Sequence, residues 1–304
     1  FIFGINIAGG IPAVVENAQS LPGYLTMMTT YDPVAGVEQP YPIINIISMI
    51  AWGLGYFGMP HILLRFMAIE DEEKLTLSRR VATIWVVISL AVAVLIGVIG
   101  LAMSDVGALK TLTGSDSETI IVQIADLLSK HGILPALLAG TILAGILAST
   151  MSTADSQLLA ASSAVSSDLF GDRVAKTGDK KKAMNAARFT LLAIAVIAAF
   201  IARDPNSSVF GIVSFAWAGF GAVFGPVVLF ALFWRRSNWQ GALAGMISGG
   251  AMVFIWKYLV RPLGGVWNIY ELLPAFSVSC LMIVIVSLLT KAPSKEITEE
   301  FDRV

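Results

Sequence analysis

The sequence predicts an all-α integral membrane protein folded as a multi-helix bundle. Composition is the first observation: 56% of the 304 residues are hydrophobic, 13% are charged, and the mean hydropathy is +0.79. The second is that several stretches of about 20 residues, the length that crosses a bilayer core of roughly 30 Å, contain no Lys, Arg, Asp or Glu. We therefore expect the bilayer to be the solvent of this chain.

The apolar stretches give the expected membrane helices in order. Residues 1–15 resemble the end of a helix whose beginning is missing, and Phe1 is not an initiating methionine, so we expect a fragment or a processed piece. The stretch 189–202 is short and can extend back to Ala183, whereas 207–234 is long enough to tilt. The candidate spans are 42–64, 81–103, 132–154, 189–202, 207–234, 240–256 and 272–290.

One outer loop, "SDSETIIVQIADLLSK" (115–130), predicts a helix that lies on the membrane surface. Ser115 and Glu118 have the spacing of a capping box, in which each side chain bonds the backbone N–H of the other. The apolar residues that form one helical stripe are Ile120, Ile121, Ile124, Leu127 and Leu128.

The distribution of Lys and Arg predicts the orientation in the membrane. When loops are assigned alternately to the two sides, all of the 20 basic residues except Lys110, Lys130, Arg203, Lys257 and Arg261 fall on one side. That side is cytoplasmic by the positive-inside rule, which places the C-terminus inside. The run "DKKK" (179–182) is interpreted as part of such a loop, and the net charge of −1 argues against a nucleic-acid partner.

The stretch "WGLGYFGMPH" (52–61) is poor material for a plain membrane helix. Gly53, Gly55 and Gly58 lower the cost of leaving helical geometry, and Pro60 removes a backbone N–H, so a helix break is expected here. Backbone N–H and C=O groups freed at membrane depth require hydrogen-bond partners from protein, water or a ligand. At α-helical spacing, Trp52, Tyr56 and Pro60 would share one face, which could bind a small solute. The alternative interpretation is that the glycines line a packing contact between two helices.

A second stretch, "GILASTMSTADSQ" (145–157), carries hydroxyls at positions i, i+3, i+4 and i+7: Ser149, Ser152, Thr153 and Ser156. An unpartnered hydroxyl costs roughly 2–7 kcal/mol to transfer from water to an apolar medium, so this row needs partners. The hydroxyls can bond back to carbonyls of their own helix or to a neighbouring helix. The functional alternative is ligation of a hard cation such as Na⁺ by neutral oxygens.

Asp155 lies in the same apolar run. Carboxylates inside a membrane typically belong to ion or proton pathways, although a place near the cytoplasmic mouth would make this one an ordinary hydrated group.

The sequence offers little support for an enzyme. His61 and His131 lack a nearby nucleophile–carboxylate arrangement, no zinc or iron spacing is present, and no phosphate-binding loop appears.

Four stretches, in this order, resemble the sodium:solute symporter family, and the first is most similar to its sodium/proline symporters. They are "WGLGYFGMPHILLRFMAI" (52–69), "STMSTADSQLLAASSAVSSDLF" (149–170), "FAWAGFGAVFGPVVLFALFW" (215–234) and "IYELLPAF" (269–276). The resemblance implies a fold of two inverted five-helix repeats with extra helices outside them.

On this resemblance, residues 1–304 form a single transmembrane domain that is the second half of a transporter. Residues 1–15 would end the first repeat, 41–234 would be the second repeat, 240–290 two peripheral helices and 291–304 a cytoplasmic tail. The N-terminal half of the same transporter would then be a missing partner. Since the family's central sites lie between the two repeats, this chain would carry only part of each site without the first repeat.

The resemblance also implies roles for residues. Family members bind Na⁺ through positions that match the Ser149 carbonyl and the Ser152 and Thr153 hydroxyls, with Asp155 and Ser156 as candidates for a second shell or an ion path. Proline carriers use aromatics that match Trp52 and Tyr56, with Pro60 shaping the bend.

The implied activity is Na⁺-coupled symport of a small solute, with proline favoured, across the cell membrane. Met59 stands where some proline carriers have glutamine, and Asp155 where they have serine. Pantothenate, another amino acid or a short carboxylate therefore stay open as solutes. From other classes, a channel or a membrane sensor module is the alternative.

Overall fold

The structure is a computed structural model that describes residues 1–165, 180–203 and 208–303. It contains two compact units, Phe1–Ala18 with Trp85–Ser208 (unit 1) and Gln19–Ile84 with Val209–Val304 (unit 2). Each unit has its own hydrophobic core. The stretch 149–170 and the run 179–182 extend into 166–179, and the expected span 207–234 begins at 207, so these parts lie outside the described residues.

The prediction of an all-α membrane fold is confirmed. Within the described ranges, five helices are long and apolar enough to cross a membrane, and a pair bent by 55°, Ile43–Gly58 with Pro60–Met67, would be a sixth span. The apolar helix Ala187–Ile201 is shorter than a span. The five are α5 (Lys74–Asp105), α7 (Ile133–Ala164), α10 (Val209–Phe233), Trp239–Leu263 and α12 (Leu272–Leu289).

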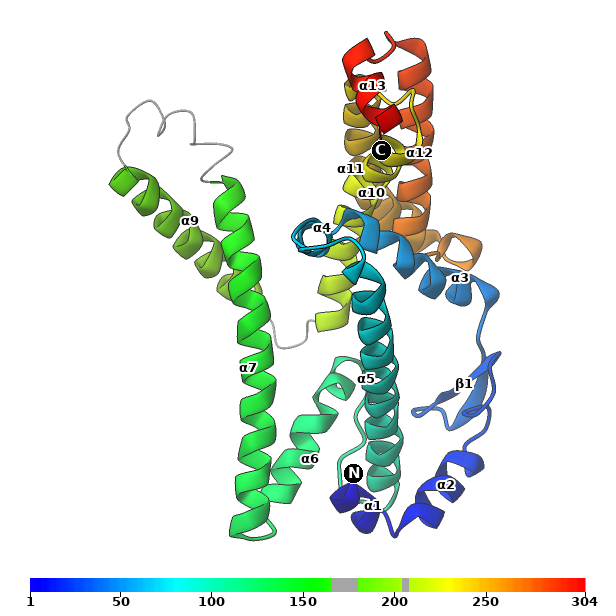
Figure 1. The fold of residues 1–304 in the computed structure, drawn as a ribbon. Helices are drawn as coiled ribbons and strands as arrows, with labels where there is room; N and C mark the ends of the chain where they lie inside the picture. Colours follow the sequence, from blue (N-terminus) through cyan, green and yellow to red (C-terminus); the bar gives the residue numbers. More distant parts are fainter. Residues whose placement is uncertain (166–179, 204–207, 304) are drawn as a thin grey trace. The chain divides into compact units, whose positions relative to one another are not determined.

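In unit 1 the N-terminal helices pack against the second part of α5 (Figure 1). The expectation of one helix over 1–15 is wrong: α1 (Ile2–Ile7) and α2 (Ile11–Ser20) are separated by Gly9 and Gly10. Their φ angles of 97° and 101° are readily adopted only by glycine, so the chain turns there. The core between these helices contains Ala8, Val14, Ile99, Ala102 and Met103.

The rest of unit 1 consists of η2 (Gly114–Thr119), α6 (Ile120–Ser129), α7 and α9 (Lys180–Ile201). The helix α6 packs against α7, and α7 against α9, where the Ser162 hydroxyl donates to the Ala187 carbonyl at 3.1 Å. The capping box expected at Ser115 and Glu118 does not form. Ser115 lies inside the 3-10 turn, and the Glu118 carboxylate accepts a hydrogen bond from the Ser208 hydroxyl at 2.7 Å.

Unit 2 begins with a two-stranded antiparallel hairpin. Strands β1 (Thr29–Asp32) and β2 (Val37–Pro40) pair in the register Thr29 to Pro40 and Asp32 to Val37. The Asp32 carboxylate accepts from the backbone N–H of Val34 at 2.9 Å and of Ala35 at 3.1 Å, which fixes the turn. The hairpin is followed by α3 (Ile43–Ala51), which begins directly after the extended residue Pro42.

The centre of unit 2 is a bundle of α10, α11 (Trp239–Ile255) and α12, visible together at the yellow to red end of the chain in Figure 1. Glycines on α11 let α12 approach closely, as small residues do between membrane helices. A Cβ at Gly245 would lie 2.9 Å from Ile283 Cδ1, and one at Gly249 would lie 3.0 Å from Ser279 Cβ. Between α11 and α12 the chain forms η4 (Trp256–Val260), η5 (Arg261–Leu263) and η6 (Gly265–Trp267).

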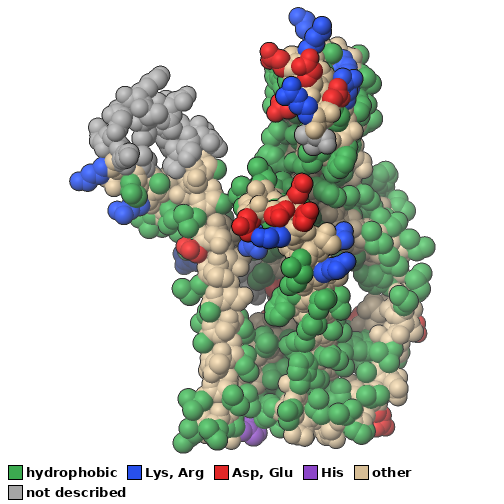
Figure 2. Space-filling model, viewed as in Figure 1, with side chains coloured by type: hydrophobic (Ala, Val, Ile, Leu, Met, Phe, Trp, Pro, Cys, Tyr) green, Lys and Arg blue, Asp and Glu red, His purple; other side chains and the backbone are tan. Residues whose placement is uncertain are grey.

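The C-terminal tail contains a helix. Residues Lys295–Arg303 form helix α13, and Arg235 Nη2 bonds Asp302 Oδ2 at 2.6 Å. Figure 2 shows the charged side chains gathered over α13 at one end of the bundle of unit 2. Both members of this ion pair are largely exposed, so it contributes at most about 1 kcal/mol.

Candidate functional site

The chain bends in the stretch that the glycines and proline single out. Helix α3 ends at Ala51, η1 (Trp52–Gly58) continues as a 3-10 helix, and Met59 is extended with φ −85° and ψ 110°. Helix α4 (Pro60–Met67) then begins with proline at its first position, where the missing N–H costs no helical hydrogen bond. The bend between the two parts is 55°.

A 3-10 helix has three residues per turn, so side chains three apart, not four, share a face. Gly55 and Gly58 are buried and face α10, while Gly53 and Tyr56 are exposed. The expectation that Trp52, Tyr56 and Pro60 share a face is therefore wrong, since it assumed α-helical spacing. Trp52, Gly55 and Gly58 recur instead at intervals of three.

Gly55 and Gly58 make the close contact between η1 and α10. A Cβ at Gly58 would lie 2.8 Å from Gly221 Cα and 2.9 Å from Gly225 N, and one at Gly55 would overlap the Trp217 ring. Gly53 has nothing within 4 Å of a Cβ. The two readings of this stretch thus coexist, because the helix is broken and two of its three glycines also form a packing interface.

Trp52 lies in a stack of aromatic rings. Its ring is nearly parallel to those of Phe210, Trp217 and Tyr270, with centroid separations of 5.5, 5.3 and 5.9 Å. The Trp217 Nε1–H donates to the Trp52 carbonyl at 2.9 Å, which satisfies a carbonyl at the break. Tyr56 meets the edge of Trp217 at 4.8 Å and 85°, so the two predicted aromatics are brought together through a third.

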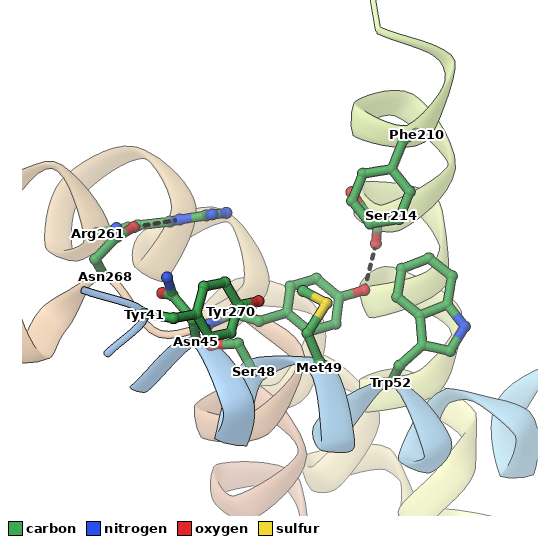
Figure 3. Close-up of a pocket in the computed structure, with 10 residues that line it drawn as sticks. All are labelled: Tyr41, Asn45, Ser48, Met49, Trp52, Phe210, Ser214, Arg261, Asn268 and Tyr270. Carbon is green, nitrogen blue, oxygen red and sulfur yellow. Dashed lines mark hydrogen bonds between the residues drawn. The ribbon is translucent and has the colours of Figure 1, made fainter. Parts of the chain in front are cut away.

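A cavity of about 200 Å³ opens beside this stack (Figure 3). Its lining comes from α3 and Tyr41 shortly before it, from η1, from α10 and from the segment that leads into α12. Trp52 lines the cavity, whereas Tyr56 and Pro60 do not. The polar lining includes Asn45, Ser214 and Arg261, so the cavity combines an aromatic wall with hydrogen-bonding groups.

An ion pair between a buried carboxylate and a partly exposed arginine lies at one side of the cavity. The side chain of Glu271 is 1% exposed, and its Oε2 accepts from Arg261 Nη1 at 2.8 Å. Arg261 Nε donates to Asn268 Oδ1 at 3.0 Å, which closes the segment before α12 into a small loop (Figure 3). Burial first, and the Glu271 carboxylate second, raise the pKa of the neighbouring Tyr270 hydroxyl.

The hydroxyl row lies on α7 in unit 1. Ser152 Oγ and Thr153 Oγ1 both donate to the Ser149 carbonyl, at 3.0 and 3.2 Å, and Ser156 Oγ donates to the Ser152 carbonyl at 2.9 Å. These bonds to the same helix are the alternative that the sequence left open, and they also gather three neutral oxygens at one point. The side chains of this row and of Asp155 are exposed.

The predicted residues thus form two groups, aromatics in unit 2 and hydroxyls in unit 1. The described ranges contain no group of three or more His, Cys, Asp or Glu that could hold a metal ion. Sequence reasoning missed most residues around the cavity. Two signals were present: Tyr270 and Glu271 lie in "IYELLPAF", and a charged residue at the start of an apolar span is a functional candidate.

Comparisons with known proteins agree with one another. The model of the sodium:solute symporter family matches residues 1–249. The high-affinity proline transporter PutP of Bacillus subtilis is 41% identical over 261 residues, which are 86% of this chain and 52% of that protein. The sodium/proline symporters of Salmonella typhimurium and Escherichia coli are 42% and 41% identical over 259 residues, 85% of this chain and 50% of each relative.

The chain therefore spans about half the length of the curated relatives it matches. No solved structure matches it.

Proposed function

Because the chain belongs to the sodium:solute symporter family, we propose that the complete protein couples Na⁺ entry to the uptake of a small solute, with L-proline as the favoured one. The relatives named above are proline transporters and support this solute. The observation that carries the proposal within this chain is the cavity beside Trp52. It pairs stacked rings with hydrogen-bonding groups, which suits a compact solute that has one apolar and one polar side.

The residues have distinct roles in the proposed mechanism. The Ser149 carbonyl and the Ser152 and Thr153 hydroxyls contribute ligands for Na⁺. Trp52 binds the solute at the cavity wall, and Tyr56, which contacts the edge of Trp217, completes the solute site from outside the lining of this cavity. Occupancy of the Na⁺ site favours the outward-open arrangement, and the repeats then rock to expose the solute inside. Coupling rests on differential binding to the two arrangements and involves no chemical step.

The energy available is sufficient for uptake. One Na⁺ moving inward across 100 mV gains about 2.3 kcal/mol, and a tenfold Na⁺ gradient adds about 1.4 kcal/mol. The total of about 3.7 kcal/mol sustains roughly a 500-fold solute gradient at one Na⁺ per solute. Accumulation of a scarce nutrient or osmolyte is within this range.

The exposed face of α7 supports a second proposal about the complete transporter. Of the 18-residue apolar segment that qualifies α7 as a membrane span, only 6% is buried, whereas the corresponding share for α12 is 33%. We assign this face to the first five-helix repeat, which would cover the hydroxyl row and supply the remaining Na⁺ ligands. The excess of Lys and Arg in the loops on one side of the membrane supports a cytoplasmic C-terminus.

Uptake by the full-length protein tests the function. Radiolabelled proline, other amino acids, pantothenate and a short carboxylate should be measured in proteoliposomes with and without a Na⁺ gradient. We expect Na⁺-dependent accumulation of proline above the other solutes. Accumulation of another member of this panel would replace the solute and keep the coupling, whereas Na⁺-independent accumulation would contradict the coupling itself.

Trp52→Ala should raise the proline concentration for half-maximal uptake by about tenfold or more, since the apolar area that the solute buries against the Trp52 ring contributes about 1.4 kcal/mol or more. The Na⁺ concentration for half-maximal binding should change little. Trp85→Ala is the matched control, because Trp85 is 69% exposed on α5. Equal loss of solute and Na⁺ binding in Trp52→Ala would indicate misfolding and contradict the assignment.

A further inference from the structure

Tyr270 belongs to the segment before the peripheral helix α12, yet its contacts are with the elements that carry the proposed solute site. It is 6% exposed and lies in the core of unit 2. Its hydroxyl donates to the Ser214 carbonyl of α10 at 2.6 Å, and its backbone N–H donates to Ser48 Oγ of α3 at 2.9 Å (Figure 3). One residue thus links α3 and α10 on the two sides of Trp52.

The ring of Tyr270 also limits the orientation of Trp52. The two rings are 5.9 Å apart and inclined by 16°, and Phe210 and Trp217 provide the other stacked neighbours. Phe210 and Trp217 both come from α10, whereas Tyr270 is the neighbour supplied from outside α10. Loss of the Tyr270 ring therefore removes the one stacked neighbour of Trp52 among these three that α10 does not supply.

The segment that presents Tyr270 is itself held in place. The Glu271 carboxylate, next in sequence, pairs with Arg261, which in turn bonds Asn268. Leu272, the following residue, is fully buried in the same core. The ring of Tyr270 consequently has little freedom to leave Trp52.

We propose that Tyr270 is a positioning residue for solute binding, which holds the Trp52 ring at the wall of the cavity through the peripheral segment 261–271. The inference rests on the proposed solute role of Trp52. Residues outside the second repeat would then contribute to the affinity for the solute. Tyr270 acts through Trp52, so its effect should appear in affinity and not in turnover.

Four variants of the full-length protein test this role. Tyr270→Leu should raise the KM for proline about tenfold, with the maximal rate and the Na⁺ half-saturation within twofold of wild type. Tyr270→Phe keeps the ring and should restore most of the affinity. Tyr258→Leu is the matched control: Tyr258 is 59% exposed and its ring meets Phe215 and Phe254 but not Trp52, so KM should stay unchanged. In a Trp52→Ala background, Tyr270→Leu should add nothing further.

Three results would overturn the inference: an unchanged KM in Tyr270→Leu, an equal rise in Tyr258→Leu, or an effect that multiplies with that of Trp52→Ala. A second measurement needs no solute. The emission of Trp52 is obtained by subtracting the spectrum of a Trp52→Phe variant made in the same background. Quenching of this emission by acrylamide should be greater in Tyr270→Leu than in the wild type. If the wild-type protein takes up no proline, the proposed solute fails, and unchanged quenching would separately contradict the positioning role.

Discussion

Gly58→Ala is expected to destabilise unit 2 by about 3 kcal/mol or more, at the upper end of the range for overpacking. The added Cβ would meet backbone atoms of Phe220, Gly221 and Gly225 in α10. Backbone of a packed helix cannot move aside as the end of a flexible side chain can, so η1 and α10 would have to separate. Thermal unfolding in detergent should show a midpoint about 6–10 °C lower, together with loss of uptake.

Gly53→Ala is the matched control for this substitution. It lies in the same 3-10 helix with nothing within 4 Å of a Cβ, and it should leave the midpoint within about 2 °C of wild type. A similar loss of stability in both variants would show that the glycines matter for backbone freedom and not for contact with α10.

Ser152→Ala and Thr153→Ala are each expected to raise the Na⁺ concentration for half-maximal uptake at least tenfold. A lost oxygen ligand to a cation is worth about 1.5 kcal/mol or more by analogy with hydrogen bonds to charged groups, and about 1.4 kcal/mol is a factor of ten. Uptake at saturating Na⁺ should recover much of the wild-type rate. The measurement is proline uptake by the full-length protein over a series of Na⁺ concentrations.

Thr150→Ala provides the control within the same helix. The Thr150 hydroxyl donates to the Ile146 carbonyl at 2.9 Å, as the row donates to its own carbonyls, but Thr150 lies beside the row and not on it. Its Na⁺ dependence should be that of wild type. Equal shifts in all three variants, or none in Ser152→Ala and Thr153→Ala, would remove the Na⁺ assignment from this row.

The membrane fold could be predicted because long apolar stretches have few alternatives in a bilayer. Local winding was harder to foresee. The same glycines permit an α-helix with a kink or a 3-10 helix, and only contact with α10 decides between them. Position-specific φ angles at Gly9 and Gly10 likewise depend on the packing of α1 and α2, which no residue pattern encodes by itself.

The candidate site divides in the same way. Trp52 could be singled out because it borders a predicted break, and it does line the cavity. Tyr270, Arg261 and Asn268 are more than 200 residues away in sequence and meet Trp52 or its cavity only through the fold of unit 2. The hydroxyl row was visible from spacing alone, since all of its bonds lie within one helix.

The winding of η1 also changes how far the chain reaches. A 3-10 helix advances about 2.0 Å per residue and an α-helix about 1.5 Å, so the 7 residues of η1 extend about 3.5 Å further than an α-helix of equal length. Rewinding to α-helical geometry would shorten the segment by that amount and turn Tyr56 by about 80° relative to Trp52. The winding of η1 thus sets both the length of the broken helix and the separation of its aromatic side chains.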